Sequence, residues 1–197
     1  MRVVQVIPPP PGATFKTTVP EDWEQLPVLH EMPLDSDPMA FMPLAAFMAD
    51  AGSMIVSISS RPAHPAGSPS LWLTHLCRHL GFHPGPATAL QDLNPNIVAS
   101  CFASQATTRG VTPMRLVLFQ DGGQWVLVTA MAVAWRWEAF EFDLLRLLGS
   151  LEILGNQGQS ALGLDSIIPF PELTQERTGR PEPRQPQICE ILRFAGI

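Results

Sequence analysis

Polar and apolar side chains alternate over several short stretches of the chain. Residues 13–19 place Phe15 and Val19 on one side of an extended segment, which is the period of a half-buried β-strand. Pro20 ends this strand, and we expect Trp23 to fold back onto the sheet. Further strands are predicted at residues 26–29, 53–60, 96–107, 113–119, 124–131 and 151–154.

Two features refine this strand pattern. An Asp-Gly-Gly turn separates segments 113–119 and 124–131, and glycine adopts the positive φ that a tight turn requires. This pair is therefore the clearest hairpin in the sequence. Residues 38–49 are apolar without a helical period, and Pro43 in their middle favours an edge strand or a β-bulge.

Two other segments have the helical period. Ser68 and Pro69 open the first helix as a capping residue and a first-turn proline, and Gly81 ends it. The second helix covers residues 137–148, and we expect Gly149 to cap it. The predicted core residues are Leu73, Leu76, Cys77 and Leu80 in the first helix, with Trp72 at the border, and Trp137, Phe140, Leu144, Leu147 and Leu148 in the second.

The two ends of the chain differ in composition from its middle. Pro8–Pro11 favours an extended polyproline form, so residues 1–12 are predicted to be a stiff lead-in. Residues 155–197 form a Pro-rich extension that loses the regular pattern, although Ile188–Phe194 returns to apolar spacing. One folded domain, residues 13–154, is predicted between these ends.

Composition and charge restrict the partners. Of the 197 residues 46% are hydrophobic, which suffices for a core, and 12 Lys and Arg against 18 Asp and Glu give a net charge of −6. An acidic chain without a basic run suits neither nucleic acid nor an anionic membrane surface. No apolar stretch is long enough to insert into a membrane, and the first apolar run is too short for a signal peptide.

The cysteines indicate the compartment. Cys77, Cys101 and Cys189 are odd in number and far apart, and no C-x-x-C pair is present. This spacing argues against a disulfide framework and favours a reducing environment. We therefore expect a cytoplasmic protein.

Candidate catalytic chemistry is sparse. The glycine motifs that bind phosphate and the G-x-S-x-G motif of hydrolases are absent from the sequence, which also has no tyrosine. His75 and His79 share a helix face and are candidate metal ligands, but two solvated histidines explain the spacing better. Cys101 paired with a histidine stays open as a nucleophile. We predict no catalytic residue, no metal and no cofactor, and hence a protein that is not an enzyme.

Two short motifs carry a family resemblance. The opening Phe15-x-x-x-Val19-Pro20-x-x-Trp23 and the closing segment 144–151 resemble those of the Mog1/PsbP-like group, including its bacterial DcrB-type members. The resemblance implies an α+β fold, in which an antiparallel β-sheet lies between helices as an α/β/α sandwich. It also implies a role in binding, because members act as GTPase adaptors, photosystem subunits, envelope lipoproteins or homodimeric chaperones of secreted toxins.

We therefore expect a protein-binding module, specifically a homodimeric chaperone or adaptor for a client of a bacterial secretion system. The alternative is a structural or accessory subunit that docks through its C-terminal tail, and a metal- or thiol-dependent enzyme is less favoured. Met-rich surfaces accept varied apolar partners, although the same residues also suit a core. The residues predicted to contact a partner are Met39, Phe41, Met42, Phe47, Met48 and Phe142.

Overall fold

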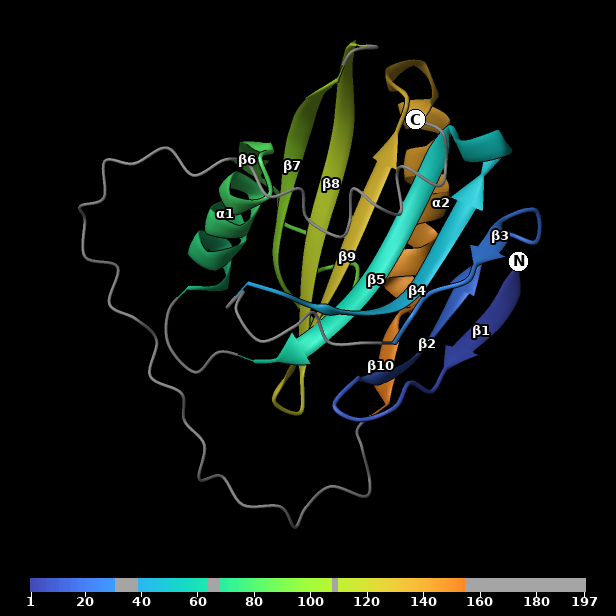
Figure 1. Cartoon of the computed structure of the whole chain (residues 1–197), viewed down its shortest axis with the longest axis vertical. Coiled ribbons are helices and arrows are strands. Elements are labelled where there is room, and N and C mark those ends of the chain that lie inside the picture. The colour runs from blue at the N-terminus through green and yellow to red at the C-terminus, as the bar shows by residue number, and fades with distance from the viewer. Residues whose placement is uncertain (31–38, 64–67, 108–109, 155–197) are drawn as a thin grey trace. The chain divides into compact units, whose positions relative to one another are not determined.

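The computed structural model describes residues 1–30, 39–63, 68–107 and 110–154 (Figure 1). The helices are α1 (Pro69–His79) and α2 (Trp137–Ser150), with the short 3-10 helices η1 (Asp50–Gly52) and η2 (Ala134–Arg136). The strands are β1 (Arg2–Val6), β2 (Thr14–Val19), β3 (Glu24–Leu26), β4 (Met42–Ala49), β5 (Met54–Pro62), β6 (His83–Ala87), β7 (Ile97–Thr107), β8 (Gly110–Asp121), β9 (Gln124–Ala132) and β10 (Glu152–Leu154). The predicted tail, including Ile188–Phe194, lies outside the described residues.

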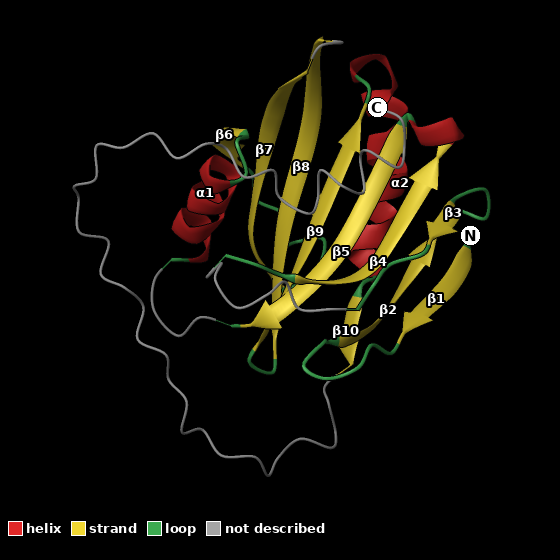
Figure 2. Ribbon diagram, in the orientation of Figure 1, coloured by secondary structure: helices red, strands yellow, loops and turns green. Residues whose placement is uncertain are grey.

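The strands form two antiparallel sheets (Figure 2). The larger sheet has seven strands in the order β3-β4-β5-β9-β8-β7-β6, and the smaller has three in the order β1-β2-β10. The predicted hairpin is β8–β9, and Gly122 and Gly123 adopt φ values of 52° and 80° in its turn. Antiparallel sheets with two helices confirm the predicted α+β class.

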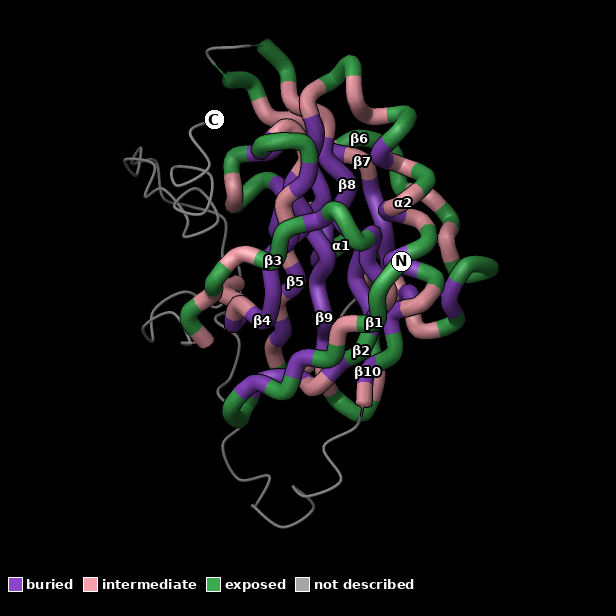
Figure 3. Tube along the Cα trace, turned by 90° about the vertical axis from the view of Figure 1, so that its right-hand side faces the viewer, coloured by how far each residue is buried: buried purple, intermediate pink, exposed green. Residues whose placement is uncertain are grey.

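The central strands of the larger sheet are buried on both faces (Figure 3). Val117 of β8 lies opposite Val128 of β9 on the face that packs against α2, which we call the α2 face. Leu116 lies opposite Cys101 of β7 on the other face, which we call the α1 face because Cys101 contacts α1 there. The helices therefore cover opposite faces of the sheet, as the α/β/α arrangement requires.

The main core lies between the α2 face, α2 and the smaller sheet. Phe15 of β2 and Phe140 of α2 are at most 1% exposed in this core. Trp23 folds back as predicted, although its ring meets Phe140 of α2, with 5.6 Å between the ring centroids. The aromatic contact closes the end of the core next to β3.

The C-terminal end of α2 is satisfied by a side chain from outside the helix. Asn94 is 6% exposed and donates from Nδ2 to the carbonyl oxygens of Leu148, at 3.0 Å, and Leu151, at 2.8 Å. The Leu148 carbonyl otherwise accepts only a long bond of 3.4 Å from the N–H of Leu151, the residue that follows the helix, so the amide supplements the weak bonding at this helix end. The helix runs on to Ser150, one residue beyond the Gly149 cap that the sequence predicts.

The strand predicted at residues 26–29 lies earlier, as β3 at Glu24–Leu26, and two further strands escaped the sequence pattern. Residues of the predicted lead-in form β1, which pairs with β2 from Arg2 opposite Val19 to Val6 opposite Phe15. The following prolines therefore belong to a hairpin connection, not to a free spacer. The other missed strand is β6, which lies in a segment predicted to be loop and pairs with β7.

The predicted irregularity of residues 38–49 is present as a β-bulge. The register of β4 against β5 shifts between Pro43 and Ala45. Proline has no backbone N–H to donate to a neighbouring strand. Pro43 is tolerated because β3 pairs with β4 only at residues 46–48, so β4 has a single neighbouring strand at Pro43. A second bulge, between Ile97 and Ala99 of β7, puts Ile97 on the α2 face, whereas the sequence pattern placed both residues on one face.

Candidate protein-binding surface

The structure separates the six predicted contact residues by exposure. Met42 and Phe47 are 1% and 0% exposed and belong to the core on the α2 face. Both residues therefore pack in the core, which was the alternative to a partner contact, and they are not available at the surface. Met39, Phe41 and Met48 are partly exposed, and Phe142 is 63% exposed.

The alternation of β4 explains part of this separation. Phe47 lies opposite Val56 on the α2 face, whereas Met48 lies opposite Ile55 on the α1 face. Met42 is held by a close approach of the backbone, because a Cβ at Gly12 would lie 2.0 Å from its Cε. The Met-rich segment is thus divided between the two faces and is not a continuous patch.

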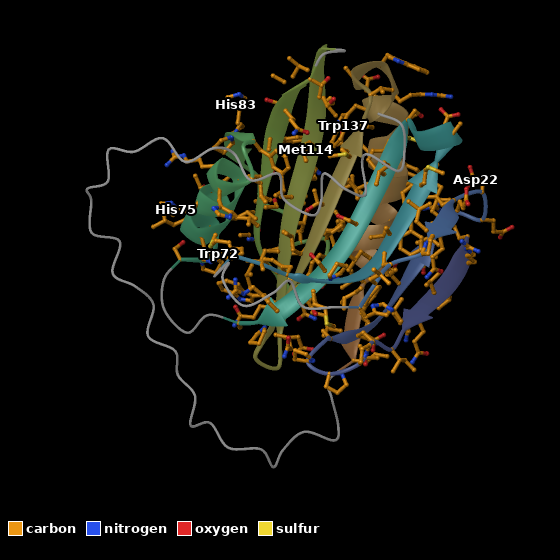
Figure 4. All side chains as sticks on the ribbon, in the orientation of Figure 1. Asp22, Trp72, His75, His83, Met114 and Trp137 are labelled. Carbon is orange, nitrogen blue, oxygen red and sulfur yellow. The ribbon has the colours of Figure 1, made fainter. Side chains whose placement is uncertain are left out.

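Phe41 belongs to an aromatic cluster on the α1 face. Its ring meets Trp72 of α1 edge-on, with 5.5 Å between centroids, and Trp72 in turn meets Trp125 of β9 at 4.8 Å. The guanidinium carbon of Arg61 lies 5.7 Å from the centroids of both Phe41 and Trp72. We call these four residues the Phe41 cluster. It packs the N-terminal end of α1 against the larger sheet, where Figure 4 labels Trp72.

The exposed aromatic residues of the α2 region form the surface best suited to a partner. Trp135 of η2 is 76% exposed and Phe142 of α2 is 63% exposed. Trp135 and Phe142 are seven residues apart in the chain, in two consecutive helical elements. An arginine lies over each ring. The guanidinium carbon of Arg136 is 4.8 Å from the centroid of the Trp135 ring, and that of Arg146 is 5.0 Å from the centroid of the Phe142 ring. We call these four residues the α2 aromatic surface.

The sequence pattern found only half of this surface. Phe142 is apolar on the polar side of a helix, which is a recognisable signal. Trp135 precedes the helix and has no periodic partner, so nothing in the pattern marks it. Arg136 is held in place by an ion pair with Asp50 of η1, which fixes the start of α2 against the end of β4.

A buried charge lies beneath α2. Arg115 of β8 is 4% exposed, and its Nη2 lies 2.9 Å from Oε1 of Glu141. Its guanidinium carbon also lies 4.0 Å above the ring of Phe102, which meets Trp137 edge-on at 5.8 Å. Burial lowers the pKa of Arg115, and the charge of Glu141 opposes that shift. The ion pair joins the sheet to α2, and its arginine is buried.

The residues weighed for catalysis are not brought together. His75 and His79 are exposed on α1, and His83 lies in β6 (Figure 4). No group of three or more His, Cys, Asp or Glu side chains that could hold a metal ion occurs within residues 1–30, 39–63, 68–107 and 110–154. The Cys101 sulfur lies 3.7 Å from the sulfur of Cys77, so its nearest chemical neighbour is a second thiol.

Neither described helix is both long and apolar enough to cross a membrane. α1 has 11 residues and α2 has 14, and each has a polar side. A bilayer-spanning helix needs about 20 apolar residues.

The elements and their order define the class of fold. Antiparallel sheets with one helix on each face of the larger sheet make an α+β fold, as the sequence predicts. No protein-family model matches the sequence, and no curated protein matches it. The comparison with solved structures does give matches.

One similar structure is the solution structure of PsbP from Synechocystis sp. PCC 6803, with 8% identity, a TM-score of 0.49 and coverage of 71% of this chain and 86% of that one. Another is a crystal structure from Bacteroides thetaiotaomicron, with 10% identity, a TM-score of 0.46 and coverage of 72% of this chain and 46% of that one. A third is LpqN of Mycobacterium tuberculosis, involved in cell envelope biogenesis, with 13% identity, a TM-score of 0.42 and coverage of 78% and 91%. The chain thus spans less than half of the Bacteroides protein.

Proposed function

We propose that this protein is a non-enzymatic protein-binding module. The observation that carries the proposal is the α2 aromatic surface. Trp135 of η2 and Phe142 of α2 are large, exposed apolar side chains in consecutive helical elements, and a guanidinium lies over each ring. Tryptophan, other aromatic residues and arginine are enriched in protein interfaces and in their energetic centres. A protein surface of this composition gains free energy when a partner removes the rings from water.

The perturbed ionisable groups support binding over catalysis. A catalytic acid or base has a shifted pKa and faces a site that a substrate can enter. Arg115 is shifted by burial, but it is paired with Glu141 and packed on Phe102. The two thiols are shifted by each other and by burial. Each of these groups is explained by a structural contact.

The finer proposal is a chaperone or adaptor for a client of a bacterial secretion system, acting as a cytoplasmic homodimer. It rests on the Mog1/PsbP-like resemblance of the opening and closing motifs and on the acidic composition. A symmetric homodimer would either bury the α2 aromatic surface of both subunits at its interface or leave both free for the client. The test must therefore measure the oligomeric state and client binding separately.

The experiment compares the full chain with two matched variants. Phe142→Asp places a charge in the α2 aromatic surface, and Val111→Asp places the same charge at a residue of β8 that is 65% exposed. Proteins that co-purify with the tagged wild type from the native host are identified and then purified, and their affinity for each variant is measured. Light scattering gives the mass of each variant in solution.

We expect Phe142→Asp to lower the affinity for the partner at least about tenfold, or to convert a dimer to a monomer. The reason is that a hot-spot residue contributes about 2 kcal/mol or more to the binding free energy. Val111→Asp should leave both readouts unchanged. If Phe142→Asp keeps every partner and the same mass as the wild type, the α2 aromatic surface is not the binding surface. If the wild type instead turns over a substrate, the proposal that the protein is a non-enzymatic binding module is wrong.

A further inference from the structure

Two cysteines that the proposed function does not use lie side by side on the α1 face. Cys77 of α1 and Cys101 of β7 are both free thiols, and their sulfur atoms are 3.7 Å apart. Cys77 is 0% exposed and Cys101 is 5% exposed. Figure 1 shows α1 alongside β6 and β7, and this packing brings the two residues together from positions 24 apart in the chain.

We propose that Cys77 and Cys101 are a modification site, where a small peroxide oxidant forms an intramolecular disulfide that ties α1 to β7. A disulfide requires its sulfurs at about 2.05 Å. From 3.7 Å, the two sulfurs must approach by about 1.7 Å to form the bond. We assign this approach to rotations of the two side chains and a shift of α1 toward β7.

The composition of the surroundings favours a disulfide over a metal. A structural zinc site needs four ligands, usually Cys and His. In the part of the chain that the structure describes, no third His, Cys, Asp or Glu completes such a group. Two adjacent thiols without further ligands have oxidation as their available chemistry.

The reaction balances with hydrogen peroxide as the oxidant. The thiolate of one cysteine attacks a peroxide oxygen, the O–O bond breaks, and a sulfenic acid and hydroxide form. The second thiolate then attacks the sulfenic sulfur, the S–S bond forms and hydroxide leaves. In total two thiols and one peroxide give one disulfide and two waters, and the two sulfurs together lose two electrons.

Cys101 is the better first nucleophile. It is the more exposed of the two, and hydrogen peroxide is small enough to reach a sulfur that a larger reagent cannot. The hydrogen bond from the Cys77 thiol lowers the pKa of Cys101, against the opposing effect of burial. The same hydrogen bond, followed by burial, raises the pKa of Cys77, which therefore keeps its proton until the sulfenic acid has formed.

The bond would close a loop from residue 77 to residue 101, which contains β6 and the Asn94 that caps α2. Closing a loop of this length restricts the unfolded chain. We expect the oxidised protein to melt roughly 5–10 °C higher than the reduced protein. The oxidised form would also hold α1 and the Phe41 cluster more firmly on the sheet.

The test uses the full chain with Cys189→Ser, which leaves only the two cysteines of the proposed pair. The folded protein is treated with hydrogen peroxide, the excess is removed, and the remaining thiols are counted after denaturation. We expect both thiols to disappear, a mass loss of about 2 Da, and a peptide that links residues 77 and 101 on proteolysis without reductant. Reductant should restore both thiols and return the melting temperature to that of the untreated protein.

Two outcomes would overturn the proposal. One is that both thiols still react after the methionines of the same sample have begun to oxidise, which shows that the pair is inert. The other is that the sulfurs are oxidised separately to sulfinic acids, with no linked peptide. The matched controls are Cys77→Ala and Cys101→Ala, each in the Cys189→Ser chain. Oxidation should not raise the melting temperature of either control.

Discussion

The two helices cover opposite faces of one sheet in different ways. α2 packs over the central strand β9 and the smaller sheet, and it contributes Phe140, Leu144, Leu147 and Leu148, all at most 1% exposed. α1 packs over the outer strands β6 and β7 and buries fewer large side chains. One of its buried residues is Cys77, whose sulfur meets that of Cys101 in β7. We therefore expect the packing around α2 to be more stable than the packing around α1.

This difference teaches how burial and function are divided. A helix with strong apolar packing can leave its outer side free to carry an interface, as α2 does with Trp135 and Phe142. A helix with weaker packing opens locally at a lower free energy than the whole domain. We expect hydrogen exchange to be faster in α1 than in α2.

The largest expected effect comes from matched truncations in the two helices. Leu144→Ala removes a side chain enclosed by α2, the larger sheet and the smaller sheet, and should lower the free energy of unfolding by about 4 kcal/mol. Leu76→Ala in α1 should lower it by about 2 kcal/mol, since the neighbouring outer strands can relax into the cavity. Urea denaturation measures both, and equal losses would contradict the proposed difference between the faces.

A smaller effect is expected from the ion pair beneath α2. Glu141→Ala leaves Arg115 buried without its partner, which we expect to lower the free energy of unfolding by about 2 kcal/mol. This figure is below that of a fully buried pair because Glu141 is 32% exposed. Glu138→Ala, at an exposed position of the same helix, is the control and should change it by less than about 0.5 kcal/mol. A loss no greater than that of the control would show that Phe102 alone satisfies Arg115.

The Phe41 cluster tests the anchoring of α1. Phe41→Ala removes an edge-on contact with Trp72 and should lower the free energy of unfolding by about 1 kcal/mol. Because Trp72 belongs to α1, the variant should speed hydrogen exchange in α1 while leaving α2 unchanged. Uniformly faster exchange in both helices would mean that the cluster supports the whole domain and not α1 in particular.

The smallest effect on stability should come from the α2 aromatic surface. Phe142→Ser alters a side chain that is already 63% exposed, so the free energy of unfolding should change by less than about 0.5 kcal/mol. Partner binding should fall at the same time, as for Phe142→Asp. A loss of stability above about 1 kcal/mol would show that Phe142 packs within its own chain and has no free surface to offer.

The sequence predicted elements whose signal is local. The Asp-Gly-Gly turn fixes the β8–β9 hairpin because glycine tolerates the positive φ that Gly122 and Gly123 adopt. The core sides of both helices followed from their period, except that Leu80, predicted to be core, follows α1 and is only partly buried. β1 was missed because its residues are mostly exposed and prolines follow, and β6 was missed because its proline and glycine residues are typical of loops.

The candidate sites depend on contacts between distant segments. Cys77 and Cys101 lie next to each other only because α1 packs on β7, and Arg115 reaches Glu141 only because α2 packs against the larger sheet. No spacing in one sequence encodes these contacts. Phe47 was assigned to a partner contact but lies in the core. An apolar residue in a strand gives the same sequence pattern whether it faces a core or a partner.

The pairing of β10 with β2 has a consequence for the order of folding. Glu152 lies opposite Lys16, and an ion pair of 2.7 Å joins the two side chains. The hairpins β4–β5, β7–β8 and β8–β9 join neighbouring segments and can assemble while the chain is still being synthesised, whereas one edge of β2 has no partner until residues 152–154 have left the ribosome. The first hairpin made is thus the last to be completed, and a nascent chain exposes its unpaired edge throughout translation of the domain.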